Sequence, residues 1–235
     1  MATDLRAAVR VLALAVVAAS GSACMMWTWD ARPNPAIEAA VRIDGPISVY
    51  DALEGLIEAG QDSPIDREYA YQAVRNNRDD TPAATFARAA ITGRLVQLQA
   101  LRGAHLVGEV ERDALRSVEL DPNFRDGAAR RLLGTLYVAA PAPFLQHGDS
   151  ERGLAMLEEL AAEQPDRLEN LLRLAEAYLA LGDPAPATSS LCRCRESRDL
   201  LRRDERLLLD RLVEQAEPLS CPAPQNDVDV AAPGL

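Results

Sequence analysis

The chain has 235 residues, of which 48% are hydrophobic, and its formal net charge is −11. This length and apolar content allow one or two globular domains and exclude a wholly disordered chain. An acidic surface without a basic stripe repels phosphate backbones, so we expect no nucleic-acid partner. Aromatic residues make up only 4%, while Ala and Leu are abundant, which predicts an all-α fold.

The N-terminus has the layout of a secretory signal. Arg6 and Arg10 precede a short apolar segment, residues 11–19, which is followed by four small residues and Cys24. This apolar segment is too short to cross a bilayer as a permanent helix. We therefore expect residues 1–23 to be a signal peptide.

The residues before Cys24 resemble a bacterial lipobox, in which the thiol after the cleavage point is lipidated. Gly21 departs from the aliphatic residue usual at that position, so ordinary cleavage without lipidation stays open. A lipidated Cys24 would anchor the protein stably on the periplasmic face of a bacterial membrane, because it carries more than one acyl chain. Residues 24–46, which contain several Pro and Gly, are then predicted to be a tether.

Helical patterns in the first half fall at residues 47–59, 64–76, 83–101 and 106–119, which indicates about two degenerate helical hairpins.

The second half repeats itself with a spacing of 34 residues between two Gly-Asp steps. The residues that define the repeat are Leu133, Gly134, Tyr137, Gly148, Asp149, Gly153, Leu157 and Pro165 in one unit and Leu174, Ala175, Tyr178, Gly182, Asp183, Ala187 and Leu191 in the next. This pattern resembles the tetratricopeptide repeat. An unrelated helical bundle with two Gly-Asp turns is the alternative.

The repeat pattern has a physical explanation in the packing of helical hairpins. Small residues such as Gly134 and Gly153 would let two helices approach closely, while Gly182 would end one helix and Asp183 would cap the next. A single hairpin cannot bury both of its faces, so neighbouring hairpins must stack. We expect antiparallel helical hairpins, stacked as a degenerate tetratricopeptide-like solenoid, over residues 47–217.

A long amphipathic helix from about residue 198 to residue 216 would cap the stack. Its predicted inner stripe contains Leu200, Leu201, Leu207, Leu208, Leu212 and Val213. Residues 218–235 are predicted to be a disordered tail.

An inserted loop separates Tyr137 from Gly148, and its two prolines forbid a continuous helix. Insertions in repeat proteins tend to decorate one face, so this loop, with Phe144 and His147, is a candidate functional element. A loop whose Phe144 fills the core is the alternative.

A family resemblance goes beyond the generic repeat and covers mainly residues 120–216. It rests on the lipobox-like start and on the spacing of Asp126-Gly127-Ala128, Leu133-Gly134, Tyr137 and Pro141 ahead of the first Gly-Asp step. This arrangement resembles the T-component lipoproteins associated with TRAP transporters. The resemblance implies a helical periplasmic lipoprotein that assembles with a substrate-binding protein.

No catalytic or metal-binding constellation is apparent. His105 and His147 each lack a second ligand at metal-binding spacing, and the chain has no phosphate-binding loop or nucleophile elbow. We therefore expect no catalytic residue, no metal and no cofactor.

Three cysteines besides Cys24 could form a disulfide in an oxidising compartment. A bridge between Cys192 and Cys194 would be strained, which makes Cys221 the better partner for one of them. The repeat position of Cys194 is normally buried, so a small core residue is the alternative role for it.

These observations predict a non-catalytic periplasmic lipoprotein that acts as a protein-interaction scaffold, with a protein or peptide in its concave groove. A TRAP-transporter-associated accessory protein that handles a small solute is the alternative. Assembly into a homo-oligomer is left open.

Overall fold

The computed structural model describes residues 32–43, 45–216 and 218–221. Within these residues the protein forms ten α-helices, three short 3-10 helices and no strand, which confirms the predicted all-α fold. The α-helices are α1 (Pro35–Arg42), α2 (Pro46–Ala59), α3 (Pro64–Val74), α4 (Pro82–Gln99), α5 (Val107–Leu120), α6 (Ala128–Ala139), α7 (Ser150–Glu163), α8 (Leu168–Ala180), α9 (Pro184–Glu196) and α10 (Arg203–Gln215). The 3-10 helices are η1 (Ala100–Leu106), η2 (Ala142–Phe144) and η3 (Arg198–Leu200).

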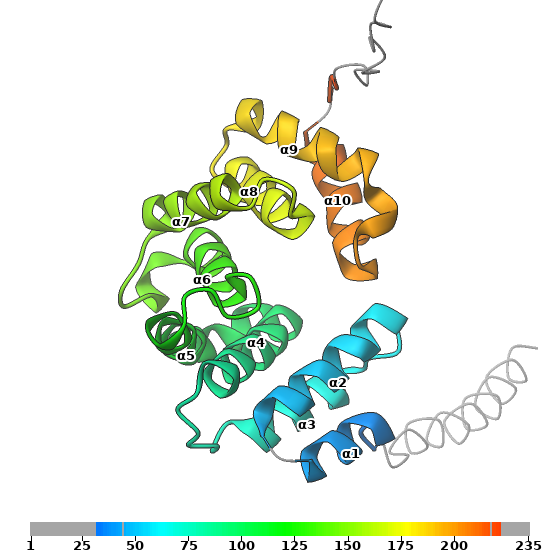
Figure 1. Ribbon diagram of the computed structural model, residues 1–235, viewed down its shortest axis with the longest axis vertical. Coiled ribbons are helices and arrows are strands. Elements are labelled where there is room, and N and C mark those ends of the chain that lie inside the picture. Colours follow the sequence, from blue (N-terminus) through cyan, green and yellow to red (C-terminus); the bar gives the residue numbers. More distant parts are fainter. Residues whose placement is uncertain (1–31, 44, 217, 222–235) are drawn as a thin grey trace, which may run out of the picture. The chain divides into compact units, whose positions relative to one another are not determined.

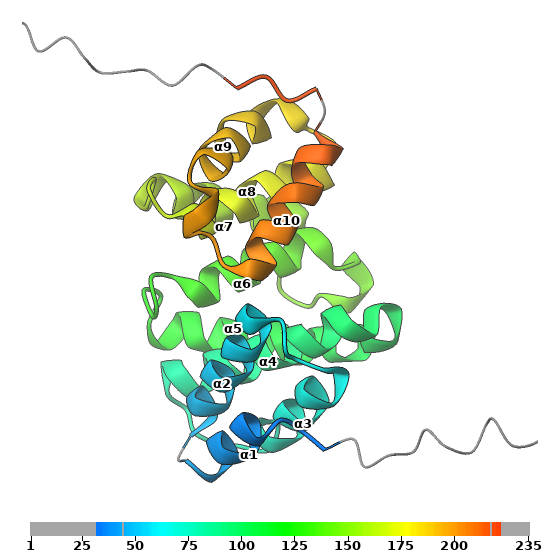
Figure 2. The ribbon, with the colours of Figure 1, turned by 90° about the vertical axis from the view of Figure 1, so that its right-hand side faces the viewer.

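Helices α2 to α9 form a stack of hairpins in chain order (Figures 1 and 2). Helix α2 packs on α3, α4 on α5, α6 on α7, and α8 on α9. The first helices of these hairpins also contact one another in series, so α2, α4, α6 and α8 form an inner layer. The four helices predicted in the first half are all present, with ends shifted by no more than two residues.

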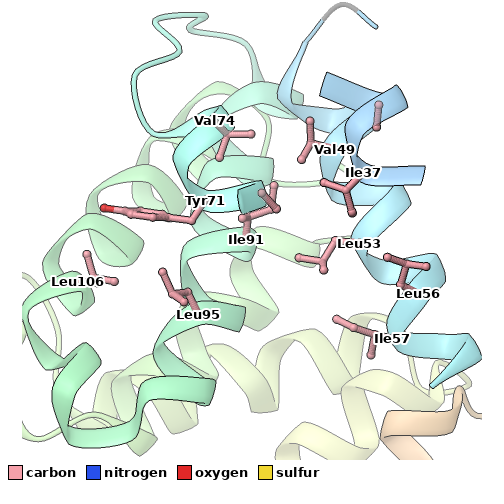
Figure 3. Close-up of a cluster of buried hydrophobic side chains, with 12 residues drawn as sticks. Ile37, Val49, Leu53, Leu56, Ile57, Tyr71, Val74, Ile91, Leu95 and Leu106 are labelled. Atoms are coloured by element: carbon pink, nitrogen blue, oxygen red, sulfur yellow. The ribbon is translucent and has the colours of Figure 1, made fainter. Parts of the chain in front are cut away.

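Helix α1 shows that the predicted tether is wrong in its second half. Pro35 lies in the first turn of this helix, and the Asn34 side chain caps it by accepting a hydrogen bond from a backbone N–H. Ile37 is fully buried and lies beside Val49 and Leu53 of α2 in Figure 3. The helix has only eight residues, which is shorter than the window over which helical periodicity is read from a sequence, and it lies among Pro and Gly residues.

The first repeat unit has the predicted close helix crossing. A Cβ atom at Gly153 of α7 would lie 2.7 Å from the carbonyl oxygen of Gly134 and 2.7 Å from the Cβ atom of Tyr137, both on α6. Leu133, Tyr137 and Leu157 are almost fully buried around this crossing. The two helices therefore pack at a separation that only glycine at position 153 permits.

The Gly148-Asp149 step joins the inserted loop to α7. A Cβ atom at Gly148 would overlap the ring of Tyr137, so glycine is required there for space. The Asp149 side chain accepts a hydrogen bond of 2.9 Å from the backbone N–H of Arg152 and caps α7. Pro165 lies between α7 and α8, where the unit was predicted to end.

The second unit differs from the prediction at one position. Ala175, Ala187 and Leu191 are fully buried, while Leu174 and Tyr178 pack at the edge of the same cluster. Gly182 has the expected positive φ of 80°. Asp183 occupies the N-cap position of α9, but its side chain accepts no hydrogen bond from that helix, so the predicted side-chain cap is wrong.

The predicted long C-terminal helix is interrupted. Residues 198–200 form η3, and α10 begins only at Arg203, because Arg202 leaves the helical conformation and donates its N–H to the Glu205 carboxylate at 3.0 Å. The interruption moves two leucines off the predicted inner stripe, since Leu200 is 81% and Leu207 53% exposed. Leu201, Leu208 and Leu212 are buried as expected, and so is Leu209.

The start of the predicted disordered tail is held by a disulfide. Cys221 is bonded to Cys192 of α9, and Leu219 packs on the cluster formed by α8, α9 and α10. Cys194 is free and buried, which agrees with its interpretation as a core residue. The predicted signal peptide, Cys24 and residues 222–235 lie outside the described residues.

The close crossing of α6 and α7 leads to a first prediction. Gly153→Ala is expected to lower the free energy of unfolding by about 1–3 kcal/mol, because the new methyl group meets backbone and Cβ atoms that cannot move aside. Gly55→Ala is a matched control on α2, where an added Cβ meets nothing within 4 Å, and it should raise stability by about 0.5–1 kcal/mol. Urea denaturation compares the two variants, and equal effects would contradict the close crossing.

Candidate functional site

A cavity of about 180 Å³ lies on the inner side of the stack. It is lined by residues of α2, α4, α6, α8 and the segment that begins α10. Helix α10 contacts α8 on one side and α2 on the other, which closes the inner side. The inner side therefore holds a partly open cavity with both polar and apolar lining, and the contacts of α10 with α8 and α2 narrow the concave groove predicted to hold a protein or peptide.

Ion pairs join α10 to α2 and α4, and we call this group the clasp: Glu54, Glu58, Arg94, Arg202 and Asp204. Glu54, whose side chain is 7% exposed, accepts hydrogen bonds from Nε and Nη2 of Arg94, both at 2.7 Å. Arg94 also donates to Asp204 at 2.9 Å, and Arg202 lies 2.9 Å from Glu54. Residues separated by up to 148 positions are thereby held together.

The electrostatics of the clasp follow from burial and pairing. Burial alone would raise the pKa of the Asp204 carboxyl, but the charges of Arg94 and Arg202 outweigh it and hold that pKa below its ordinary value. Burial likewise opposes the charge of Arg94, yet Glu54 and Asp204 raise its pKa. Asp204 and Arg94 are therefore both charged near neutral pH.

Arg131 of α6 occupies a different environment in the same cavity. Its Nη1 atom donates a hydrogen bond of 2.7 Å to Oδ1 of the buried Asn170. The Asn170 amide nitrogen donates in turn to Gln164 and to the Leu160 carbonyl oxygen, which fixes the orientation of the amide. Burial lowers the pKa of Arg131, and within the described residues its hydrogen-bond acceptor is a neutral group.

An apolar groove of about 390 Å³ lies next to this cavity. Its walls come from α4, η1, α5, α6 and η2, and they include Val96, Leu101, Val107, Val110, Leu132, Leu136, Ala139 and Phe144. Leu101 is 86% exposed and Phe144 is 40% exposed at this groove. The chain turns sharply where α4 ends, at Ala100, which has a φ of 49°.

The inserted loop supplies one wall of the groove. Glu111, which is 1% exposed, accepts hydrogen bonds from the backbone N–H groups of Gln146 and His147 at 2.8 and 2.7 Å. This anchor holds the loop against α5 and leaves Phe144 half-exposed, so the alternative in which Phe144 fills the core is wrong. Nothing in the sequence marks Glu111, because the loop that it anchors lies 35 residues away.

Tyr137 lies beside the same buried carboxylate. Burial raises the pKa of Tyr137 to about 12, and the neighbouring Glu111 adds to this effect. The hydroxyl is therefore neutral over the whole physiological range and serves as part of the packing between α6 and the loop.

The cavity and the groove meet between α4 and α6. Both are lined by Gly93, Gln97, Leu132 and Thr135. Gly93 presents no side chain at this junction, and a Cβ atom built there would lie 3.7 Å from Leu132. The two spaces therefore lie next to each other and have these four residues in common as lining.

No group of three or more potential ligand residues that could hold a metal ion occurs in the described parts of the chain. Nor is any helix among those residues both long and apolar enough to cross a membrane. His105 contacts the Arg102 carbonyl oxygen, and His147 lies 3.7 Å from Glu111, so the structure does not bring the two histidines into one described site.

Comparison with known families bears on the repeat. A family model, that of the tetratricopeptide repeat, matches residues 144–191, a segment that runs from the inserted loop through α7 and α8 into α9. No curated protein matches the chain. The matched segment contains both Gly-Asp steps and the buried small residues of the second unit. The chain is therefore an all-α helical-repeat protein with a tetratricopeptide-repeat segment at residues 144–191.

Proposed function

We propose that this protein is a non-catalytic lipoprotein of the bacterial envelope that is tethered at Cys24 and holds a protein partner at its apolar groove. The proposal rests on the groove of about 390 Å³, where Leu101 and Phe144 expose apolar surface. Exposed apolar hollows of this kind mark interaction sites, and helical repeats build their binding surfaces from successive units.

The cysteines support the exported location in this proposal. The Cys192–Cys221 disulfide joins α9 to the segment after α10, and disulfides persist in oxidising compartments such as the periplasm. Together with the signal-like layout of residues 1–23 and the lipobox-like residues before Cys24, this bond favours a protein that works outside the cytoplasm.

The position of the groove follows from the closure of the stack. Because the clasp fills the inner side with paired charges, a partner approaches the other opening, between η1 and the inserted loop. Apolar side chains of the partner would fill the groove, as buried anchors do at the centres of protein interfaces. The predicted interaction is retained in this proposal, but its place moves from the concave face to the α4–α6 groove.

Site-specific crosslinking in intact cells tests this proposal. A photoreactive amino acid at position 101 or 144 is expected to crosslink the same protein partner, because both positions line the groove. Position 200 is the matched control for position 101, since Leu200 is 81% and Leu101 86% exposed but Leu200 lies outside the groove. Equal crosslinking from all three positions, or none from 101 and 144, would count against the groove as the docking site.

The accessory role in solute transport is the second candidate. It is favoured by the cavity around Arg131, where a buried guanidinium lies next to an apolar groove of ligand-binding size. In this second candidate the partner at the groove would be a substrate-binding protein that exchanges a small solute with this chain.

A further inference from the structure

Helices α1 and α3 lie at one end of the stack (Figures 1 and 2), and we call the exposed residues of α1, of its C-cap and of α3 the end face. These residues are mostly uncharged: Pro35, Ala36, Ala39, Val41, Arg42, Ile43, Pro64, Glu68, Tyr69, Gln72 and Ala73. Only Arg42 and Glu68 among them carry a charge, and Glu68 accepts hydrogen bonds from Gln72 and from Gln99 of α4. Glu38 of α1 is half-buried. The end face is therefore nearly free of charge, in a chain of which 26% of the residues are charged.

The other end of the hairpin series has a different surface. Helix α9, the last of the series, exposes Arg193, Arg195 and Glu196. Terminal units of helical repeats need such a polar outer surface to stay soluble. The apolar end face lacks this property, which indicates that something covers it.

Apolar side chains of α1 and α3 surround a hollow on the end face. Val41 and Ile43, which are 37% and 61% exposed, line this hollow of about 220 Å³ together with Ala73 of α3. Tyr69, one helical turn before Ala73, is 36% exposed, and Arg42 lies between Val41 and Ile43 in the chain. This composition suits the surface region of a bilayer, where Tyr and Arg place their apolar parts toward the lipid and their polar ends toward water.

The segment between Cys24 and α1 is short. Pro35 comes eleven residues after Cys24, so an extended chain between them spans at most about 40 Å. The same segment contains the only two tryptophans of the chain, Trp27 and Trp29, and Trp is enriched at membrane–water interfaces. A lipid at Cys24 would therefore keep the start of α1 close to the bilayer surface.

We propose that the end face rests on a phospholipid bilayer, with Val41, Ile43 and Tyr69 in the interfacial region and Arg42 at the lipid phosphates. This inference rests on the proposed function, because it needs the lipid at Cys24. The tether makes the contact intramolecular, so a small apolar surface is sufficient. The scarcity of carboxylates on the end face lets an acidic protein approach an anionic lipid surface at this end.

Quenching by spin-labelled lipids tests the proposal on the lipidated full chain, purified from bacterial membranes and placed in vesicles of phosphatidylethanolamine and phosphatidylglycerol. A fluorescent label is attached at Ile43→Cys, and it reacts only there because Cys192 and Cys221 are bonded and Cys194 is buried. Lipids with a spin label near the head group are expected to remove most of its emission. The same label at Leu200→Cys is the control, since Leu200 is 81% exposed and lies beside the connection between α7 and α8, and its emission should persist.

Two pairs of charged substitutions show whether the end face itself makes the contact. Ala39→Asp combined with Ala73→Asp puts carboxylates on the end face, and it should restore most of the emission from position 43, because a carboxylate loses hydration when it enters the lipid interface. Ala155→Asp combined with Ala162→Asp is the matched control at exposed positions of α7, and it should leave the quenching unchanged. Circular dichroism checks the fold of each variant, and flotation with the vesicles checks that it stays anchored.

Mass spectrometry of Cys24 separates this inference from the proposed function. A chain without lipid at Cys24 would overturn the tether and the bilayer contact together. A lipidated chain in which the label at position 43 is quenched no more than the label at position 200 would overturn the bilayer contact alone. Crosslinking of position 43 to a second copy or to another protein would also overturn it, since protein would then cover the end face.

Discussion

Arg94→Met is expected to lower the free energy of unfolding by about 3–5 kcal/mol, which makes it one of the most damaging single changes in the chain. The substitution removes the guanidinium that Glu54 and Asp204 share. Because the side chain of Glu54 is 7% and that of Asp204 22% exposed, water cannot fully replace the lost partner. Chemical denaturation followed by circular dichroism measures the difference.

The same variant should also shift acid unfolding. In the wild type the folded-state pKa of Asp204 lies below its unfolded value, so its contribution to stability is complete above the unfolded pKa and is lost as the pH falls through the folded pKa. Removing Arg94 raises the folded pKa of Asp204, so the midpoint of acid unfolding should move to higher pH. Arg116→Met, at an exposed pair with Asp80, should leave that midpoint unchanged, and a similar shift in both variants would contradict the special role of the clasp.

Cys221→Ser should lower the free energy of unfolding by about 2–4 kcal/mol, because the disulfide to Cys192 closes a loop across 29 residues. The bond limits the conformations of the unfolded chain and holds Leu219 against the C-terminal cluster. The measurement is urea denaturation with and without a reductant.

The reductant provides the internal control for the disulfide. Wild type should fall to the stability of Cys221→Ser when it is reduced, whereas the variant should not respond. Cys194→Ala should still respond to the reductant, because Cys194 is free. A wild type indifferent to reductant would show that the bond does not contribute to stability.

The parts of the fold that could be predicted are those that depend on contacts between residues close together in the sequence. Gly134 and Gly153 meet at a helix crossing that tolerates no larger residue at position 153, so the packing is visible as a repeated small residue. Gly182, with its positive φ, and the cap at Asp149 likewise depend on their own neighbours. These constraints act within one hairpin, where the number of residues between two positions determines whether they lie close together in the structure.

The candidate site depended on contacts that no local pattern contains. Glu54 and Arg202 come from opposite ends of the stack, and the closure they form turned the expected concave groove into a cavity. The apolar groove needs the bend at Ala100 and the anchor at Glu111. A buried Glu in a helix looks the same in sequence as a solvated one, so Phe144 could be singled out while the residue that positions its loop could not.

The contact between α10 and α2 has a consequence for how the molecule comes apart. In an open array of repeats either terminal unit can peel away while its neighbours persist, since each touches only the next. Here the last helix, α10, packs on α2 of the first hairpin. Unfolding of either one therefore exposes the surface of the other that it had covered. Unfolding of either end of the stack should therefore destabilise the other end as well. Partly unfolded intermediates should be scarcely populated.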